Sequence, residues 1–320
     1  AELEFLAGFI ALRKLNDPMT ARRHFQHLKS GVSTPISLSR AHYWEGRSEE
    51  ALGNLAAARV AFEAGAKHQT AYYGLLSAEK LGLPLDAALL ADARPIDWGK
   101  ATFAQSSVLD AAKLLIAAGD LDLGKRFVLH LAESLGPVEL GQLADFALQN
   151  RQPHIAVLIG KQAASRGVIL PHAYFPVVDM VPDGLAVSRA LALSIARRES
   201  EFNVGVVSPA GALGLMQVMP GTAKMMAAKT GKPYALGQLT TDPAYNVGLG
   251  AAYLGQLVEE FGPAVALIAS GYNAGPGRPR RWVTEFGDPR QGGVDVVDWV
   301  ETIPFSETRT YVMRVVESLV

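Results

Sequence analysis

The chain lacks cysteine and has no apolar run long enough to cross a membrane. Without cysteine it can form neither disulfides nor thiolate-held metal sites. Cysteine usage therefore does not indicate whether the protein works in an oxidising or a reducing compartment. Its apolar stretches fall short of the roughly 20 residues of a spanning helix, and we expect no integral membrane segment. The seven histidines are scattered without metal-ligand spacing. We therefore expect no metal and no cofactor.

The chain also has no excess of positively or negatively charged residues. Lysine and arginine total 30, aspartate and glutamate total 31, and the formal net charge is −1. A nearly neutral chain lacks the basic surface that nucleic acids require, so we expect no nucleic-acid partner. With 320 residues, of which 49% are hydrophobic, the chain can bury a substantial core. That length predicts two domains or more.

The first 169 residues have a nearly continuous helical pattern with short breaks. Helices joined by such tight turns fold as antiparallel pairs. Phe25, Tyr43, Trp44 and Phe62 alternate with small alanines, as in stacked helical hairpins. These features predict a mainly α protein that begins with an α-superhelix. The breaks fall at residues 16–18, 31–35, 82–84, 119–120, 136–137 and 152–153.

Two changes in the pattern predict domain boundaries. One lies near residues 170–174, and a softer one lies near 95–98. We expect an α-superhelical region at 1–97, truncated at its N-terminus, and a helical linker region at 98–169. The remaining residues, 170–320, form the predicted catalytic domain. The chain starts inside a helical pattern without a signal peptide, so we expect a processed or truncated form of a longer, exported protein.

Glu199 is an acid at a position where a helix should be apolar. Leu191, Ala192, Ile195 and Ala196 form an apolar stripe, and Glu199 continues it. Burial disfavours the carboxylate, and the negative end of the helix dipole acts in the same direction. Such a carboxyl suits proton donation near neutral pH. The stripe alone equally allows a surface charge or a core acid paired with Arg197 or Arg198.

Turn-forming residues after Glu199 end the helix and require a tight loop. Within that loop the segment 214–220, GLMQVMP, places one amide among apolar residues whose backbone can approach a ligand closely. Gln217 would orient a polar group, while Met216 and Met219 would form a soft apolar wall. Taken alone, the segment could also be a buried hairpin.

Four ordered blocks over about 120 residues are more specific than any one of them. They are RESEFN at 198–203; SPAG at 208–211 running into GLMQVMPGTA at 214–223; GYNAGPGR at 271–278 with Trp282 close behind; and IPFSETR at 303–309 followed by Tyr311 and Val312. From Ala192 onwards the chain resembles the catalytic domain of the soluble lytic transglycosylases, whose fold is related to goose-type lysozyme. Gly271 and Pro279 depart from the usual pattern and leave fine substrate preference open.

The resemblance implies a lysozyme-like α+β catalytic domain with a small β-hairpin region, and Glu199 as its sole catalytic acid and base. Glu199 would protonate the oxygen between N-acetylmuramic acid and N-acetylglucosamine, then accept the proton of the muramyl 6-hydroxyl. That hydroxyl would close a 1,6-anhydro ring without water, unlike the usual two-carboxylate glycosidases. The enzyme would be a carbon–oxygen lyase acting on peptidoglycan.

The resemblance also implies a set of substrate-binding residues. Ser208 matches the serine that contacts the acetamido group, which is thought to stabilise the developing positive charge. Gln217 and Met219 would line the sugar site, and Tyr272 and Asn273 would form its opposite wall. The set is completed by Met216, Glu307 and Tyr311.

Each of these positions also has an ordinary structural explanation. Tyr272, after an expected helix at 263–270, could be core packing with its hydroxyl bonded internally. Glu307 could serve the start of a helix, where an acid complements the dipole. Arg309 is expected to pair with an acid inside the protein, although it could reach substrate carboxylates.

The segments YWEGR at 43–47, GN at 53–54 and YYGLL at 72–76 resemble the superhelical region that precedes this catalytic domain in the family. The implied role is to hold glycan strands, and the alternative is a protein-binding solenoid. Peptidoglycan glycan strands are the expected partner and the periplasm the expected location. Cell-wall or secretion machinery partners are unknown.

Three functions stay open at this point. The first is a lytic transglycosylase, the second a lysozyme-like muramidase that uses water, and the third a noncatalytic glycan or protein scaffold. The hydrolase would need a second carboxylate across the cleft from Glu199. Its candidates are Asp242, Asp288, Asp295 and Asp298.

Overall fold

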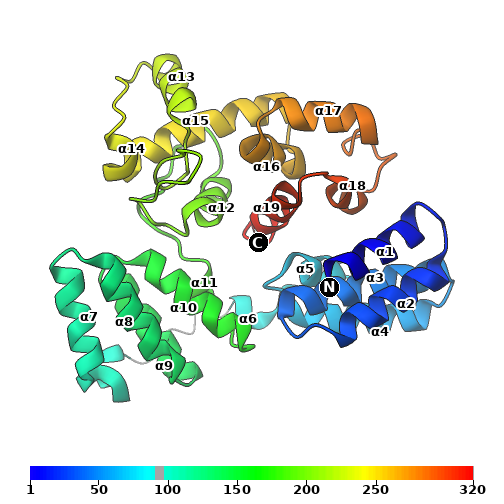
Figure 1. The fold of residues 1–320 in the computed structure, drawn as a ribbon, viewed down its shortest axis with the longest axis horizontal. Helices are drawn as coiled ribbons and strands as arrows, with labels where there is room; N and C mark the ends of the chain where they lie inside the picture. Colours follow the sequence, from blue (N-terminus) through cyan, green and yellow to red (C-terminus); the bar gives the residue numbers. More distant parts are fainter. Residues whose placement is uncertain (91–96, 320) are drawn as a thin grey trace. The chain divides into compact units, whose positions relative to one another are not determined.

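The computed structural model describes residues 1–90 and 97–319, and these residues are mainly helical (Figure 1). They divide into two compact units, one of residues 1–93 and 161–171 and the other of residues 94–160 and 172–320. Pro95 and Ile96, at the softer of the two expected boundaries, lie outside the described residues. None of the described helices combines the length and the apolar character needed to cross a membrane.

The first unit is a stack of helices built from neighbours in the sequence. Helix α1 packs on α2, α2 on α3, and α3 on both α4 and α5. Its elements are α1 (Glu2–Arg13), α2 (Pro18–Ser30), α3 (Pro35–Ala51), α4 (Leu55–Gly65), the short 3₁₀ helix η1 (Ala66–His68), α5 (Tyr72–Lys80) and α6 (Ala87–Leu90).

Aromatic side chains fill the interior of this stack. Phe25, Tyr43, Trp44 and Phe62 are all buried, and the Tyr43 and Trp44 rings lie 5.6 Å apart, edge to face. Small residues let the helices approach these rings: a Cβ on Gly46 would lie 2.6 Å from the ring of Phe62. The predicted arrangement of stacked hairpins with aromatic side chains between small residues is confirmed.

The predicted helix breaks coincide with the ends of the observed helices. Proline occupies the first helical position of α2 and α3, where its missing N–H costs nothing. The side chains of Asp17 and Thr34 cap these two helices by accepting hydrogen bonds from Thr20 N (3.0 Å) and Ser37 N (3.4 Å). These local signals explain why the helix boundaries were predictable from sequence.

The second unit begins with a smaller helical array. It comprises η2 (Trp98–Lys100), η3 (Thr102–Gln105), α7 (Ser107–Ala117), α8 (Leu121–Glu133), α9 (Pro137–Gln149) and most of α10 (Pro153–Ser165). Trp98 fixes the start of this array to α9, because its indole N–H donates to Gln149 Oε1 (2.8 Å) and its ring meets Phe146 edge to face.

The rest of the second unit is a helical domain around a single core. Its helices are α11 (Pro171–Tyr174), α12 (Arg189–Ser200), α13 (Pro220–Thr230), α14 (Gln238–Thr241), α15 (Pro243–Phe261), α16 (Val265–Ala274), α17 (Gly277–Phe286), α18 (Val296–Thr302) and α19 (Ser306–Val316). Helix α19 packs against both α12 and α16, which brings together segments far apart in the sequence (Figure 1).

The expected β-hairpin region is reduced to isolated bridges. Leu213 bridges Val207 on one side and Val218 on the other, and no longer strand forms among the described residues. Gly211 and Gly214 have positive φ values of 85° and 72°, so the chain turns before a ladder can extend. The result is a tight loop between α12 and α13.

Candidate active site

Glu199 lies in the last turn of α12, as its apolar stripe predicts. Leu191, Ala192, Ile195 and Ala196 are all buried, and Glu199 itself is partly buried. The helix ends at Ser200, the next residue, because Glu201 takes a left-handed conformation with φ of 50°. Glu199 is therefore held at the end of the helix face that packs in the core.

The Glu199 carboxyl has an environment that favours its protonated form. Loss of hydration on burial raises its pKa from 4.5 to about 7, and the negative charge of Glu307 acts in the same direction. A hydrogen bond from the Tyr311 hydroxyl to Glu199 Oε1 (2.7 Å) and the charge of Arg198 lower the pKa, but they do not offset the burial. A carboxyl with this pKa can act as acid or base near neutral pH.

Glu199 does not form the ion pair with Arg197 or Arg198 that its sequence also allowed. Arg197 turns to the other side of α12, where its Nε donates to the Tyr174 carbonyl (2.6 Å). Arg198 packs over the Tyr311 ring instead, with its guanidinium carbon 5.5 Å from the ring centroid. Within the described residues, the one hydrogen-bond partner of the Glu199 carboxyl is Tyr311.

Replacing Tyr311 with phenylalanine tests this account of Glu199. The change removes the hydroxyl that lowers the pKa of Glu199, so the pKa should rise and the alkaline limb of a pH–activity profile should move up by about one unit. Tyr245→Phe is the matched control, because its buried hydroxyl bonds to Pro233 O and Ala235 N instead. An alkaline limb that stays in place or moves down would contradict the assignment.

In the loop after α12, Gln217 and Ser208 each keep one polar group available for a ligand. Gln217 has φ of 48°, and its amide nitrogen donates to the carbonyls of Val206 and Gly214. This orientation leaves its amide oxygen as an acceptor for a ligand. Ser208 Oγ accepts from Ala212 N (2.9 Å), so its own proton remains free to donate.

The two methionines expected to form an apolar wall have different positions. Met219 is 44% exposed and can contact a ligand. Met216 is fully buried, and its sulfur lies so close to Gly250 that a Cβ there would be 2.7 Å away. The side chain of Met216 therefore belongs to the core, and the wall formed by both methionines is not what the structure contains.

Tyr272 and Asn273 lie within α16, not after it. The expected helix end at Ser270 is wrong, because helical structure continues to Ala274, just before Gly275 with its φ of 79°. The Tyr272 hydroxyl donates to the Met216 carbonyl (2.8 Å), and Asn273 Oδ1 accepts from Thr308 Oγ1 (2.6 Å). The bond to Thr308 connects α16 to the start of α19.

Glu307 is an exposed acid in the first turn of α19. That position is favourable for the helix dipole, and the charge of Glu307 also reaches Glu199, whose pKa it raises. Both explanations of Glu307 are therefore compatible with the structure. Arg309 pairs internally with the buried Glu301, Nε to Oε2 at 3.5 Å, as predicted.

The four candidate second carboxylates all have other structural roles. Asp242 caps α15 and Asp295 caps α18 through backbone N–H groups. Asp288 forms a bidentate pair with Arg290. Asp298 belongs to the first turn of α18. Among the described residues, Glu307 is the acid whose charge acts on Glu199, and none of the four aspartates does so.

Sequence reasoning missed Asn246, which organises the loop from within α15. Its side chain is fully buried; Oδ1 accepts from Met216 N (2.8 Å), and Nδ2 donates to the carbonyls of Leu213 (2.8 Å) and Leu239 (2.9 Å). Gly214 must be glycine because a Cβ would lie 1.9 Å from the Leu239 carbonyl. We expected the backbone of this segment to approach a ligand closely. At Gly214 it instead approaches the backbone of α14.

Two further residues connect the end of α12 to its surroundings. The Ser200 hydroxyl bonds to the Leu215 carbonyl (2.7 Å) and thereby ties the helix to the loop. His154 of α10 donates from Nδ1 to the Glu201 carbonyl (3.1 Å), at the residue that ends the helix. The signal for Ser200 was its place beside Glu199, whereas no local pattern marked His154.

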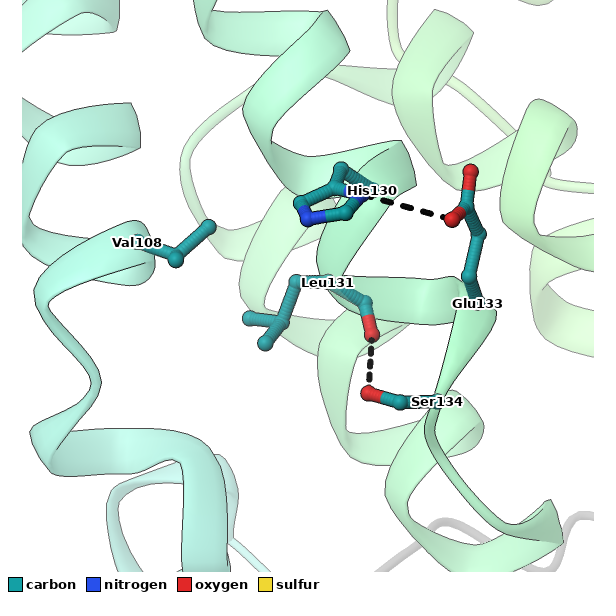
Figure 2. Close-up of a pocket in the computed structure, with 5 residues that line it drawn as sticks. All are labelled: Val108, His130, Leu131, Glu133 and Ser134. Atoms are coloured by element: carbon teal, nitrogen blue, oxygen red, sulfur yellow. Dashed lines mark hydrogen bonds and ion pairs between the residues drawn. The ribbon is translucent and has the colours of Figure 1, made fainter.

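A separate surface depression lies on the helical array of the second unit. It has a volume of about 340 Å³ and is lined by Val108, His130, Leu131, Glu133 and Ser134 (Figure 2). Its polar contacts are local to the end of α8: His130 contacts Glu133, and Ser134 donates to the Leu131 carbonyl. Among the described residues there is no cluster of His, Asp or Glu arranged to hold a metal ion.

Comparison with known proteins identifies the domain that carries Glu199. The family model described as the transglycosylase SLT domain matches residues 182–291. The soluble lytic murein transglycosylase of Escherichia coli K12 is 37% identical over 190 residues, which is 58% of this chain and 29% of that protein. The membrane-bound lytic murein transglycosylase C of Serratia proteamaculans is 32% identical over 165 residues, 45% of each protein.

Solved structures extend the similarity to the whole fold. The 70-kDa soluble lytic transglycosylase from Escherichia coli matches with a TM-score of 0.78 and 27% identity, over 99% of this chain and 50% of that one. An inactive Glu-to-Gln mutant of the lytic transglycosylase Slt from Pseudomonas aeruginosa gives a TM-score of 0.73 and 28% identity, over 98% and 50%. The present chain thus spans about half the length of these solved relatives.

The two kinds of comparison agree with each other. Sequence similarity covers the helix that carries Glu199 and the loop after it, and structural similarity includes the helical array before them. The expected resemblance and the expected fold class, a helical superhelix followed by a lysozyme-like domain, are confirmed. The chain therefore contains a transglycosylase SLT domain and is homologous to the soluble lytic murein transglycosylases.

Proposed function

We propose that this protein is a lytic transglycosylase that cleaves the β-1,4 bond between N-acetylmuramic acid and N-acetylglucosamine in peptidoglycan. The observation that carries the proposal is Glu199, whose pKa is raised to about 7 by burial and whose carboxyl has Tyr311 as its hydrogen-bond partner. Its place in a transglycosylase SLT domain supports the same conclusion.

In the first step protonated Glu199 donates to the bridging oxygen. The bond between that oxygen and the muramyl anomeric carbon breaks, and the N-acetylglucosamine residue leaves with its 4-hydroxyl restored. Glu199 is now a carboxylate, and positive charge develops on the muramyl ring. Ser208, whose hydroxyl proton is free to donate, would hold the acetamido group that stabilises this charge.

In the second step the muramyl 6-hydroxyl attacks the anomeric carbon. Glu199 accepts the proton of that hydroxyl and returns to its starting form, so no water is consumed. One group can serve in both steps because a pKa near the working pH allows both protonation states. Within this proposal Gln217, Met219, Tyr272, Asn273 and Glu307 line the sugar site.

The helical regions at 1–97 and 98–169 are proposed to bind glycan strands, with residues 170–320 as the catalytic domain. Peptidoglycan as substrate implies a periplasmic or cell-wall location. A related solved structure is a complex of the 70-kDa soluble lytic transglycosylase with bulgecin A. That relative therefore binds a ligand.

Mass spectrometry of the fragments released from purified peptidoglycan tests the proposal. The protein should release muropeptides that end in 1,6-anhydro-N-acetylmuramic acid, and Glu199→Gln should release about 10²- to 10⁴-fold less of them. Incubation in water enriched in oxygen-18 sharpens the result, because a transglycosylase incorporates no label. Reducing ends carrying the label would instead identify a hydrolase, with Glu307 as the acid to test next. The absence of fragments from either protein would favour a binding scaffold.

A further inference from the structure

Arg198 is a charged side chain at the candidate site for which the proposed function gives no role. It precedes Glu199 in the last turn of α12 and is partly buried. Its Nε atom is fully buried and has no hydrogen-bond partner within the described residues. A buried donor without a partner is costly, so its retention needs an explanation.

Several other partly buried cations of this protein have acidic partners, and the buried Arg197 donates to a carbonyl and a hydroxyl. The pairs are Arg22 with Glu49 (3.5 Å), Lys29 with Glu45 (2.7 Å), Arg309 with Glu301 (3.5 Å) and Arg314 with Glu317 (2.8 Å). The guanidinium of Arg198 packs instead on the ring of Tyr311, 5.5 Å from its centroid. Among the described residues no acid forms an ion pair with it.

Tyr311 connects this cation to the candidate acid. Its ring lies under Arg198, and its hydroxyl donates to Glu199 Oε1 at 2.7 Å. Tyr311 is 2% exposed, so the side chain that contacts both charged groups is itself shielded from water. A cation and a carboxylate that contact the same buried side chain attract each other more strongly than they would in bulk water.

We propose that Arg198 is a positioning residue that stabilises the carboxylate form of Glu199 across the ring of Tyr311. The inference rests on the proposed function in one respect, because that mechanism makes Glu199 a carboxylate between its two proton transfers. The charge that Arg198 stabilises is then the anion that exists during turnover. When Glu199 is protonated, this attraction is absent.

The other charged and titratable groups around Glu199 are consistent with this role. Glu307 of α19 opposes the carboxylate by its negative charge, while Tyr311 supports it by donating a hydrogen bond. Tyr272 of α16 is partly buried, and the charge of Glu199 helps to raise its pKa, but its hydroxyl donates to the Met216 carbonyl. Arg198 is thus the cation that lowers the pKa of Glu199.

The test is a direct titration of the Glu199 carboxyl by carbon-13 NMR in the full chain, with the signal assigned from Glu199→Gln. Arg198→Gln is expected to raise the pKa of Glu199 by about 0.5 to 1 unit. Arg198→Lys should keep it within a few tenths of the wild-type value, because the charge remains. Arg281→Gln removes the same charge from α17, where Arg281 pairs with Glu285, and should leave the titration unchanged.

A purely structural role for Arg198 predicts a different pattern. Loss of packing on Tyr311 would leave the Glu199 titration unchanged, and Arg198→Met, which keeps apolar contact with the ring, would then behave like wild type. Either of these results would overturn the proposal. Should Arg198→Gln fold poorly, Arg198→Met supplies the same comparison and is also expected to raise the pKa.

The same variants separate this inference from the proposed function. The titration requires no turnover, so it would show the effect of Arg198 even if peptidoglycan were not cleaved. In active protein, Arg198→Gln should also move the alkaline limb of the pH–activity profile upward, and Arg198→Lys should restore it. Normal anhydro-muropeptide release combined with an unmoved titration would remove the role of Arg198 and leave the transglycosylase proposal intact.

Discussion

Glu199→Gln is expected to lower turnover on peptidoglycan by about 10²- to 10⁴-fold, the usual contribution of a general acid. Glutamine has nearly the shape of glutamic acid and can accept the Tyr311 hydrogen bond, so binding and folding should be retained. Fragment release over time measures the effect, with Glu259→Gln, an exposed acid on α15, as the matched control. Residual cleavage above a few per cent would exclude Glu199 as the acid.

The same variant should be more stable than the wild type at alkaline pH. Because the pKa of Glu199 is raised in the folded state, from 4.5 to about 7, the folded protein binds an extra proton between these values. The wild type therefore loses stability from this group as pH rises through that window, and the loss is complete above about pH 7. Glu199→Gln removes the titration and thus the loss.

The expected stability difference is near zero at pH 4.5 and grows to on the order of 2 to 3 kcal/mol at pH 8 in favour of Glu199→Gln. The full pKa shift would correspond to about 3.4 kcal/mol, and the expected value is lower because a partly exposed carboxylate keeps some of its hydration. Denaturant unfolding of both proteins across this pH range measures it. A constant difference between the two curves would show that Glu199 has an ordinary pKa.

Asn246→Ala should cost about 3 to 5 kcal/mol of folding free energy, because three buried backbone groups lose their partner at once. These groups are the N–H of Met216 and the carbonyls of Leu213 and Leu239. The same bonds hold the loop that carries Gln217, so turnover should fall as well. Chemical denaturation gives the free energy, and the anhydro-muropeptide assay gives the turnover.

Asn203→Ala is a suitable control for Asn246, since its side chain accepts one local hydrogen bond, from Gly205 N. It should cost less than about 1 kcal/mol. A loss of similar size in both variants, or less than about 1 kcal/mol for Asn246→Ala, would mean that the loop is held by packing and not by the Asn246 hydrogen bonds.

The parts of this structure that sequence could predict are those with local causes. Proline at the start of α2 and α3 and the capping side chains before them define helix boundaries within a few residues. The stripe ending at Glu199 predicted both a helix and a partly dry carboxyl, and both are present. Such features depend on neighbours along the chain, which a sequence displays directly.

The features that the sequence did not predict depend on contacts between residues far apart in the chain. Met216 and Met219 look alike in sequence, yet contact with Gly250 of α15 makes one a core residue. Asn246 lies mid-helix, where nothing local reveals that it bonds a loop thirty residues earlier. Tyr272 extends α16 past the expected end because packing against α19 outweighs the low helix propensity of glycine at 271.

The hydrogen bond between Tyr311 and Glu199 joins residues 112 positions apart in the chain. Contacts of such separation form late in folding, since a long loop must close first. Until α19 docks on α12, Glu199 is a hydrated acid that has already released its proton to neutral solvent. Docking raises the pKa of Glu199 and draws that proton back. The protonated form that the proposed mechanism requires therefore exists at neutral pH only once the domain has assembled.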